Sequence, residues 1–191
     1  MIVALTPTFA SAAVCVVLAL SPPAQGQPLP LGINPATFGE LIWRETNADR
    51  AAHGQPALEL ASRITHAAQK YAEYQARTNA TGHHADGQDP AQRIVAEGFR
   101  PCYWSENVYE QWNRPLLASW LDAAEGAMRS WRNSPGHALN MRDARAKYLG
   151  VGVAAWRHGD RNYYKVVQLF ADDCPLRRVN EADAALEALR Q

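Results

Sequence analysis

Apolar residues in the first two thirds of the chain recur at the spacing of amphipathic helices. Asn34-Pro35 is typical of a helix start, because Asn caps the first turn and Pro needs no N–H there. Gly54 and Gly98 are placed to end helices, and Ser134-Pro135-Gly136 ends the last one. The helices predicted in this way cover residues 34–54, 62–78, 89–98 and 115–133.

The last third of the chain changes to the alternation of β-strands. Residues 148–156 and 163–171 are rich in β-branched and aromatic residues, and His158-Gly159-Asp160 forms a turn between them, which predicts a hairpin. A shorter strand is expected over residues 106–109. Because helices come first and strands mostly last, the pattern favours a segregated α+β domain.

The N-terminal segment predicts export. No charged residue precedes Glu40, and residues 3–20 are largely apolar and small, too short and too mixed for a stable membrane span. Ala24-Gln25-Gly26 supplies the small residues that a signal peptidase reads. The segment lacks the Lys or Arg residues with which a signal peptide usually begins, so the alternative is that it is retained as an N-terminal anchor. The predicted divisions are a signal peptide at 1–26 that is removed, a short lead at 27–36, the domain at 37–174 and a helical tail at 175–191.

The charge of the chain limits its possible partners, and its cysteines predict a disulfide. The chain has 19 basic and 19 acidic residues, and no basic stretch dense enough to bind phosphates, so nucleic acid is a poor partner. After export, Cys102 and Cys174 remain, and two cysteines in an exported chain indicate one disulfide. Closing so long a loop stabilises the fold by about 4 kcal/mol on the chain-entropy model. Two unpaired thiols are the alternative.

Five short motifs, taken in order, resemble the CAP superfamily of SCP-like extracellular domains, which includes cysteine-rich secretory, venom antigen and plant pathogenesis-related proteins. The likeness covers roughly residues 37–172 and is closest to the bacterial type. It implies an α-β-α sandwich with a small antiparallel sheet flanked by helices. The motifs are Asn47-x-x-Arg50 with Ala67-Ala68-Gln69, Gly82-His83-His84-Ala85-Asp86-Gly87 with Pro90 and Arg93, Ser105-Glu106-Asn107-Val108, Trp131-Arg132-Asn133-Ser134-Pro135-Gly136-His137 with Asn140-Met141, and Gly150-Val151-Gly152-Val153 with Gln168-Leu169-Phe170.

The resemblance implies a central cleft lined by His83, Glu106 and His137, which in some members holds a divalent cation. Two neutral imidazoles and a carboxylate suit zinc or a similar ion, and no other cofactor is expected. The family's second acid is in doubt, because Ser134 stands where many members have Glu, and Glu125 lies more than one turn upstream. The alternative is structural: Glu106 pins a loop, and His137 caps a helix end or binds Asn140.

Several neighbouring residues have competing interpretations. His84 competes with His83, although the spacing to Asp86-Gly87 favours His83. Asn107 and Asn140 are expected to hold loops through side-chain to backbone bonds, and Arg93 to pair with an acid. Other histidines, namely His53, His66 and His158, are expected at the surface or in turns. Aromatic residues are favoured as core over a glycan or lipid groove; these are Trp104, Tyr109, Trp112, Trp120 and Trp131.

Nothing in the sequence identifies a dedicated enzyme. There is no Gly-x-Ser-x-Gly motif, and nothing adjacent activates Ser105 or Ser134 as a nucleophile. Enzymatic activity is left open, and the favoured hypothesis is a secreted or periplasmic module that binds an extracellular ligand such as cell-wall glycan, peptide or lipid. A hydrolase acting on peptides or peptidoglycan through the same cleft, or a lipid or sterol carrier, is the alternative.

Overall fold

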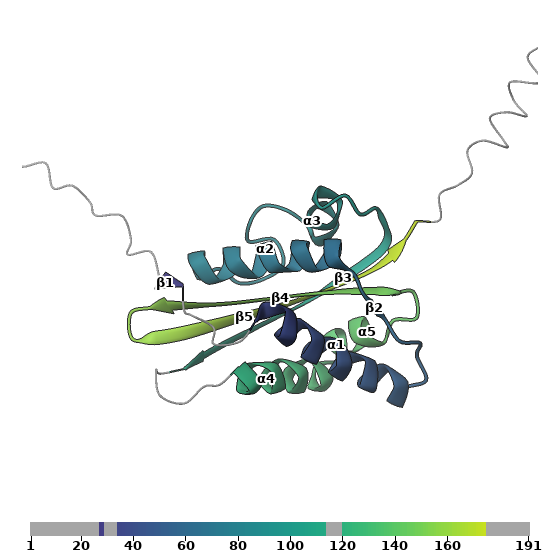
Figure 1. Ribbon diagram of the computed structural model, residues 1–191, viewed down its shortest axis with the longest axis horizontal. Coiled ribbons are helices and arrows are strands. Elements are labelled where there is room, and N and C mark those ends of the chain that lie inside the picture. The colour runs from purple at the N-terminus through teal and green to yellow at the C-terminus, as the bar shows by residue number, and fades with distance from the viewer. Residues whose placement is uncertain (1–26, 29–33, 114–119, 175–191) are drawn as a thin grey trace, which may run out of the picture.

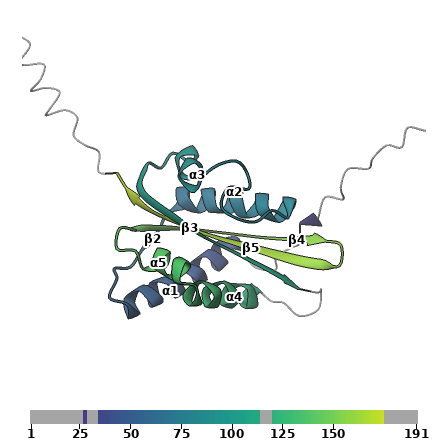
Figure 2. The same cartoon turned by 180° about the vertical axis from the view of Figure 1, so that it is seen from behind.

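A five-stranded sheet lies between two layers of helices. The structure is a computed structural model that describes residues 27–28, 34–113 and 120–174. Helices α2 and α3 cover one face of the sheet, and α1, α4 and α5 cover the other (Figures 1 and 2). The elements in chain order are β1 (Gln27–Pro28), α1 (Pro35–Ala52), β2 (Glu59–Leu60), α2 (Ser62–Thr78), α3 (Pro90–Ala96), β3 (Pro101–Asn113), α4 (Trp120–Asn133), α5 (Pro135–Arg142), β4 (Tyr148–His158) and β5 (Arg161–Asp173).

The sheet has the strand order β1-β4-β5-β3, with β2 beside the other end of β4. All pairs are antiparallel except the two-residue pairing of β2 with β4, which is parallel. The predicted α+β sandwich and the hairpin of β4 and β5 are confirmed. The outer side of β3 has no strand partner among the described residues.

Two apolar cores, one on each face of the sheet, hold the layers together. The first joins Phe38 of α1 and Trp131 of α4 to the sheet, and the second joins Tyr71 of α2 and Ile94 of α3 to the opposite face. These residues are 1% exposed or less, so nearly all of their apolar area is removed from water. The apolar positions that recur with helical periodicity in the sequence are therefore the faces that the helices bury in the core.

Strand β3 is much longer than the predicted segment 106–109. It pairs with β5 along almost its whole length, from Pro101 to Asn113. Glu106 and Asn107 are both buried, on opposite faces of the strand. Because buried polar residues on both faces hide the usual alternation of apolar and polar positions, the pattern underestimated this strand.

The chain resumes a helix immediately after the predicted stop at Ser134-Pro135-Gly136. Helix α4 does end at Asn133, but Ser134 adopts an extended conformation and Pro135 begins α5. Pro fits the first turn of a helix, so the signal that ends one helix also starts the next. The start expected near Pro115 lies outside the described residues, as do the predicted signal peptide at 1–26 and tail at 175–191.

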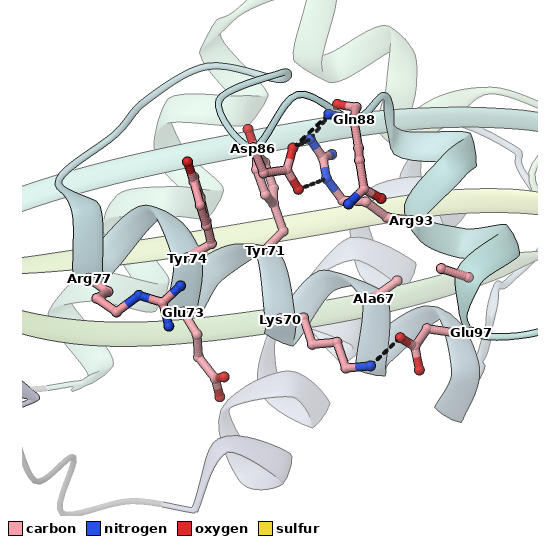
Figure 3. A pocket seen from close by; sticks show the side chains of 11 residues that line it. Ala67, Lys70, Tyr71, Glu73, Tyr74, Arg77, Asp86, Gln88, Arg93 and Glu97 are labelled. Atoms are coloured by element: carbon pink, nitrogen blue, oxygen red, sulfur yellow. Dashed lines mark hydrogen bonds and ion pairs between the residues drawn. The ribbon is translucent and has the colours of Figure 1, made fainter.

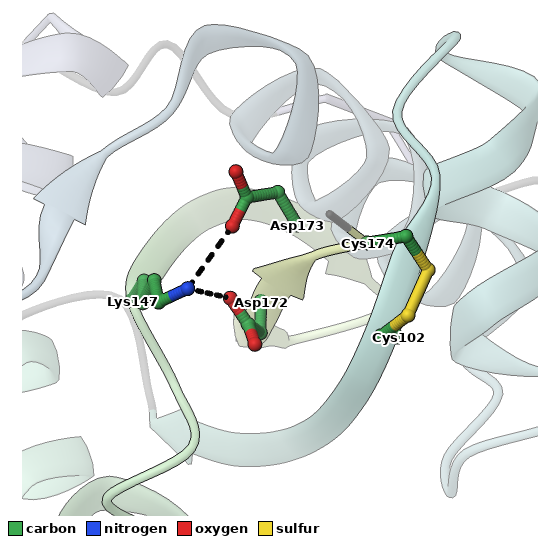
Figure 4. The surroundings of a disulfide bond; sticks show 5 residues. All are labelled: Cys102, Lys147, Asp172, Asp173 and Cys174. Carbon is green, nitrogen blue, oxygen red and sulfur yellow. Dashed lines mark hydrogen bonds and ion pairs between the residues drawn. A yellow bond between two sulfur atoms is a disulfide. The ribbon is translucent and has the colours of Figure 1, made fainter. Parts of the chain in front are cut away.

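The predicted disulfide is confirmed. Cys102 and Cys174 are bonded, with 4.7 Å between their Cα atoms, and they stand 72 positions apart in the sequence. The bond joins the beginning of β3 to the residue after β5 (Figure 4). Nearby, the Lys147 ammonium lies 2.8 Å from a carboxylate oxygen of Asp172. The covalent link therefore fixes the end of the edge strand that leads into Glu106.

The aromatic residues divide between core and surface. Trp131 is fully buried, as expected, and Tyr109 is partly buried against it. The core prediction is wrong for Trp104 and Trp112, which are 41% and 50% exposed. The side chain of Trp120 lies outside the described part of the chain.

Within the described residues, no helix combines the length and the apolarity that a bilayer crossing requires.

Glycines in β4 allow α2 to lie directly on the sheet. A Cβ atom at Gly152 would stand 2.2 Å from the backbone carbonyl carbon of Ala68, and one at Gly150 would stand 2.3 Å from that of Ile64. Backbone cannot retreat as a flexible side chain can, so any larger residue must push the helix away.

We expect Gly152→Ala to lower the free energy of unfolding by about 1–3 kcal/mol, because it overpacks the contact with α2. The control is Gly136→Ala, where no atom lies within 4 Å of the added Cβ and where alanine suits a helix. Urea denaturation with the disulfide intact measures both changes. Equal stability of the two variants would contradict the close contact.

Candidate functional site

The candidate site surrounds the edge strand β3. The alternation of side chains along the strand sends Glu106 toward the α2 layer and Asn107 toward α4 and α5. Residues from the two helix layers therefore meet these neighbours on opposite faces of a single strand. The free outer side of β3 leaves room for both layers to approach each other.

Glu106 has a side chain that is only 1% exposed. One carboxylate oxygen lies 2.8 Å from His83 Nδ1, and the other accepts a hydrogen bond of 3.0 Å from Arg93 Nη1. Both oxygens are thus occupied by cationic or polar partners. The suggestion that Glu106 pins a loop is supported, but through side chains rather than through backbone N–H groups.

Arg93 is the centre of the network. Its Nε and Nη2 groups donate to the two carboxylate oxygens of Asp86, at 2.9 and 2.8 Å (Figure 3). Nη2 also donates to the carbonyl oxygens of His83 and Gln88. The guanidinium lies 3.4 Å from the centre of the Tyr71 ring. The expectation that Arg93 pairs with acids is confirmed. The pairing links α3 to β3 and to residues 82–87, here called the histidine loop.

The histidine loop is also fixed from α2. Tyr71 donates its hydroxyl to the carbonyl of Gly82, and Gln75 donates to the same oxygen at 2.8 Å. The backbone N–H of Ala85 donates back to the Tyr71 hydroxyl. His83 is therefore held by its neighbours, although its own side chain is 43% exposed.

On the other side of β3, two asparagines place the first turn of α5. Asn140 donates to the carbonyl of Glu106 at 3.1 Å and to the side-chain oxygen of Asn107 at 2.9 Å. Asn107 in turn donates to the carbonyl of His137 at 3.2 Å. Both asparagines make side-chain to backbone bonds, as expected, but the carbonyls they bind belong to β3 and α5 rather than to loops. His137 does not cap α4; it lies inside α5, and its Nδ1 is buried without a hydrogen-bond partner.

The two imidazoles have opposite electrostatic environments. The hydrogen bond to Glu106 raises the pKa of His83 above its ordinary value. Burial lowers the pKa of His137, and the charge of His83 lowers it further. Burial raises the pKa of Glu106, although the hydrogen bond from His83 and the charge of Arg93 act against this.

Among the described residues, no group of three His, Cys, Asp or Glu side chains has an arrangement that could hold a metal ion. Glu106 does not contribute a ligand to such a group, because its two carboxylate oxygens are used by His83 and Arg93. The carboxylate is therefore placed to orient His83 rather than to bind an ion itself. His83 retains its second ring nitrogen, and His137 its buried Nδ1.

Other candidates lie apart from this network. His84 is exposed, with its Nδ1 3.2 Å from the Gln88 carbonyl, and Glu125 is exposed on α4, in a hollow formed with α1. Ser105 accepts a hydrogen bond from Tyr103, and Ser134 makes no side-chain cap. Within the described part of the chain, no histidine ring is hydrogen-bonded to either serine. The remaining histidines, His53, His66 and His158, lie elsewhere on the helices and the hairpin.

A hollow of about 550 Å³ lies behind the network, between α2 and α3 (Figure 3). Its walls include Lys70, which pairs with Glu97, and Tyr74, whose hydroxyl donates to the carbonyl of Ala85. Arg93 and Asp86 form its inner wall, where they already satisfy each other. Sequence reasoning missed this hollow because its residues come from three separate segments.

The opposite shifts of the two histidines can be measured by NMR. In protein kept metal-free with a chelator, we expect His83 to titrate above the ordinary histidine pKa and His137 below it. Glu106→Gln should lower the pKa of His83, because the neutral amide favours the imidazolium far less. Titration of both rings at the same pH would contradict the arrangement.

Arg93→Lys tests the central network. Lysine keeps the charge but cannot satisfy Asp86, Glu106 and two carbonyls at once, so we expect a loss of roughly 3 kcal/mol in the free energy of unfolding. Arg63→Lys is the control, since Arg63 makes one exposed hydrogen bond to Gly98. Thermal or urea unfolding compares them, and similar small losses would show that the network contributes little.

Comparison with known proteins supports the fold. The model of the CAP family, described as the cysteine-rich secretory protein family, matches residues 43–170. An extracellular protein containing an SCP domain from Bacillus anthracis str. Ames aligns with a TM-score of 0.59 and 20% identity, covering 76% of this chain and 44% of that chain. An outer surface protein from Borrelia burgdorferi aligns with a TM-score of 0.55 and 17% identity, and the alignment covers 74% of this chain and 97% of that chain.

At these identities the structural likeness shows the fold alone, and this chain spans less than half the length of the Bacillus protein. No curated protein sequence matches significantly. The family match, however, covers well over half of the chain and contains the histidine loop, the Glu106 segment and the His137 segment. The chain therefore belongs to the CAP family of cysteine-rich secretory proteins.

Proposed function

We propose that this chain is an exported binding module whose ligand site is centred on His83 and His137, with a divalent ion such as zinc held by the two imidazoles. The observation that carries the proposal is the hydrogen bond between His83 Nδ1 and Glu106. A carboxylate that holds one ring nitrogen orients the other and raises its basicity, as in many metal sites. Glu106 is accordingly proposed as the orienting group and not as a ligand.

The second imidazole fits the same role. The buried Nδ1 of His137 has no partner in the described structure, and an unsatisfied buried nitrogen is costly unless a ligand or water uses it. The low pKa of His137 favours the neutral form, which is the form that binds metals. Two protein nitrogens leave two positions of a four-coordinate zinc for water or for a ligand. When bound, the ion would supply a Lewis acid that anchors a ligand oxygen.

Export is supported by three observations. The sequence predicts a signal peptide at 1–26, the disulfide of Cys102 and Cys174 suits an oxidising compartment, and the two structural relatives are described as extracellular and outer-surface proteins. We propose a secreted or periplasmic location. The hydrolase alternative lacks a described serine bonded to histidine, and it gains no support from the site.

Isothermal titration with zinc tests the metal part. We expect binding of one ion, a loss of at least about tenfold in affinity for His83→Ala and for His137→Ala, and a loss of about 10–100-fold for Glu106→Gln through the orientation of His83. The control is His66→Ala, because His66 is exposed on α2 and lines a different hollow, together with Gly39 and Val151. The absence of heat with the unmodified protein, or unchanged affinity in the double histidine variant, would refute the site.

A further inference from the structure

The outer edge of β4 is open at Val151, and the outward positions on either side of it are closed. The Leu149 carbonyl accepts a hydrogen bond from the N–H of Ala61. The N–H and C=O of Val153 both bond to the side chain of Gln69. Outward groups recur at every second residue of an antiparallel strand, so the N–H and C=O of Val151 also point away from β5.

The pairing of β4 with β2 stops just short of Val151. The carbonyl of Ala61, which would accept from the Val151 N–H if the pairing continued, accepts instead from the N–H of Thr65 as α2 begins. No group in the described part of the chain bonds to the N–H or the C=O of Val151. Val151 is 3% exposed, and a sheltered donor and acceptor without partners are costly. An occupant that both donates and accepts would satisfy them.

A mainly apolar hollow of about 320 Å³ lies at this edge, between the beginning of α1 and the first half of α2. Val151 forms part of its wall, together with Gly39 of α1 and Leu60 of β2. A Cβ atom at Gly39 would stand 4.0 Å from the Val151 carbonyl oxygen, so the missing side chain leaves that oxygen uncovered from this direction. Thr65 also lines the hollow, and its buried Oγ1 has no hydrogen-bond partner in the described structure.

The neighbouring residue Val153 shows which chemistry fits such a backbone pair. The carboxamide of Gln69 accepts from the N–H of Val153 and donates to its C=O, each at 2.9 Å. A primary carboxamide can do both because one of its N–H groups lies on the same side as its oxygen. Val151 presents the same pair of groups about 7 Å further along the strand. A carboxamide on a ligand would therefore match it.

The walls of the hollow favour a neutral ligand. Glu40 and His66 are the ionisable residues of the described lining, and neither Lys nor Arg belongs to it. A carboxylate would bring its oxygens against the Val151 carbonyl with no fixed cation to offset the loss of water, which is costly. An ester or a tertiary amide would offer no N–H to that carbonyl. A primary carboxamide avoids both penalties.

We propose that this hollow is a binding site, separate from the histidine site, for a neutral ligand that carries a primary carboxamide on a small apolar body. The carboxamide bridges the N–H and C=O of Val151, and its second N–H donates to the hydroxyl of Thr65. The apolar body packs against Leu60, which is 39% exposed. This inference goes beyond the proposed zinc site and does not depend on it.

The probe is cyclohexanecarboxamide, titrated into the disulfide-bonded protein labelled with ¹⁵N and followed by the NMR signal of the Val151 amide. We expect a dissociation constant of about 1–10 mM, as suits a ligand of about nine heavy atoms. The signal should move downfield because the N–H gains an acceptor. The N,N-dimethylamide and the methyl ester keep the apolar body but lose the donor, so they should bind about tenfold more weakly.

Variants of the protein test the walls. Gly39→Ala adds a methyl group beside the Val151 carbonyl at ordinary contact distances, and alanine suits a helix, so the fold should be kept while binding weakens about tenfold. Thr65→Val removes a hydroxyl that has no described partner, and it should weaken binding several-fold. The matched control is Gly136→Ala, where an added Cβ meets nothing within 4 Å and binding should be unchanged. Thermal unfolding checks that all three variants are folded.

The carboxamide could be carried by a free small molecule or by the amidated end of a peptide. A tetrapeptide that ends in leucinamide separates these sources, with the same peptide as a free acid for comparison. Tighter binding of the leucinamide peptide than of cyclohexanecarboxamide would assign the site to a peptide end. Equal or weaker binding would assign it to a small molecule, and in both cases the free acid should bind less well.

The proposal is overturned if the Val151 signal does not respond to cyclohexanecarboxamide. It is also overturned if the ester and the dimethylamide bind as tightly, because the hollow would then accept any apolar body, or if Gly39→Ala binds as well as Gly136→Ala. The zinc site can fail independently. Carboxamide binding should be unchanged in His83→Ala and in the presence of a chelator, and zinc affinity should be unchanged in Gly39→Ala.

Discussion

The site depends on the burial of one guanidinium. Arg93 is 5% exposed, and a charge removed so far from water is tolerated only when it is paired and its donors are satisfied. Asp86, Glu106 and the carbonyls of His83 and Gln88 meet this need from the histidine loop and from β3. Because one planar group bonds to all of them, the loop, helix α3 and the strand cannot shift independently. The position of His83 is a consequence of this pairing.

The free edge of β3 explains how two helix layers can share one site. A central strand would separate His83, on the α2 side, from His137, on the α5 side. At an edge, the two layers can approach each other around the strand. The same edge has to be closed against unwanted pairing, which Asn140 and Trp131 do at two positions.

Hydrophobic periodicity predicted the elements whose buried faces are apolar, and it failed where buried polar residues occupy a face. Helix α2 and the β4–β5 hairpin were correctly placed, because their buried residues recur at 3.6 or 2 positions. Strand β3 was underestimated because Glu106 and Asn107 are polar on both faces, and α5 was missed because Pro135 was taken only as a stop. The site residues came from motif resemblance, whereas the role of Arg93 as a common partner, and the engagement of both Glu106 oxygens, needed three dimensions.

The charge of the network sets the chemistry that His83 can perform. Arg93 carries one positive charge, and Asp86 with ionised Glu106 carries two negative charges, so the cluster has an excess negative charge when His83 is neutral. Protonation of His83 removes that excess, which is why the hydrogen bond to Glu106 raises the pKa of His83. A cation at the second ring nitrogen would provide the same compensation. A proton and a metal ion would therefore compete to compensate this one excess charge. Because burial lowers the pKa of His137, that ring would favour the metal ion over a proton.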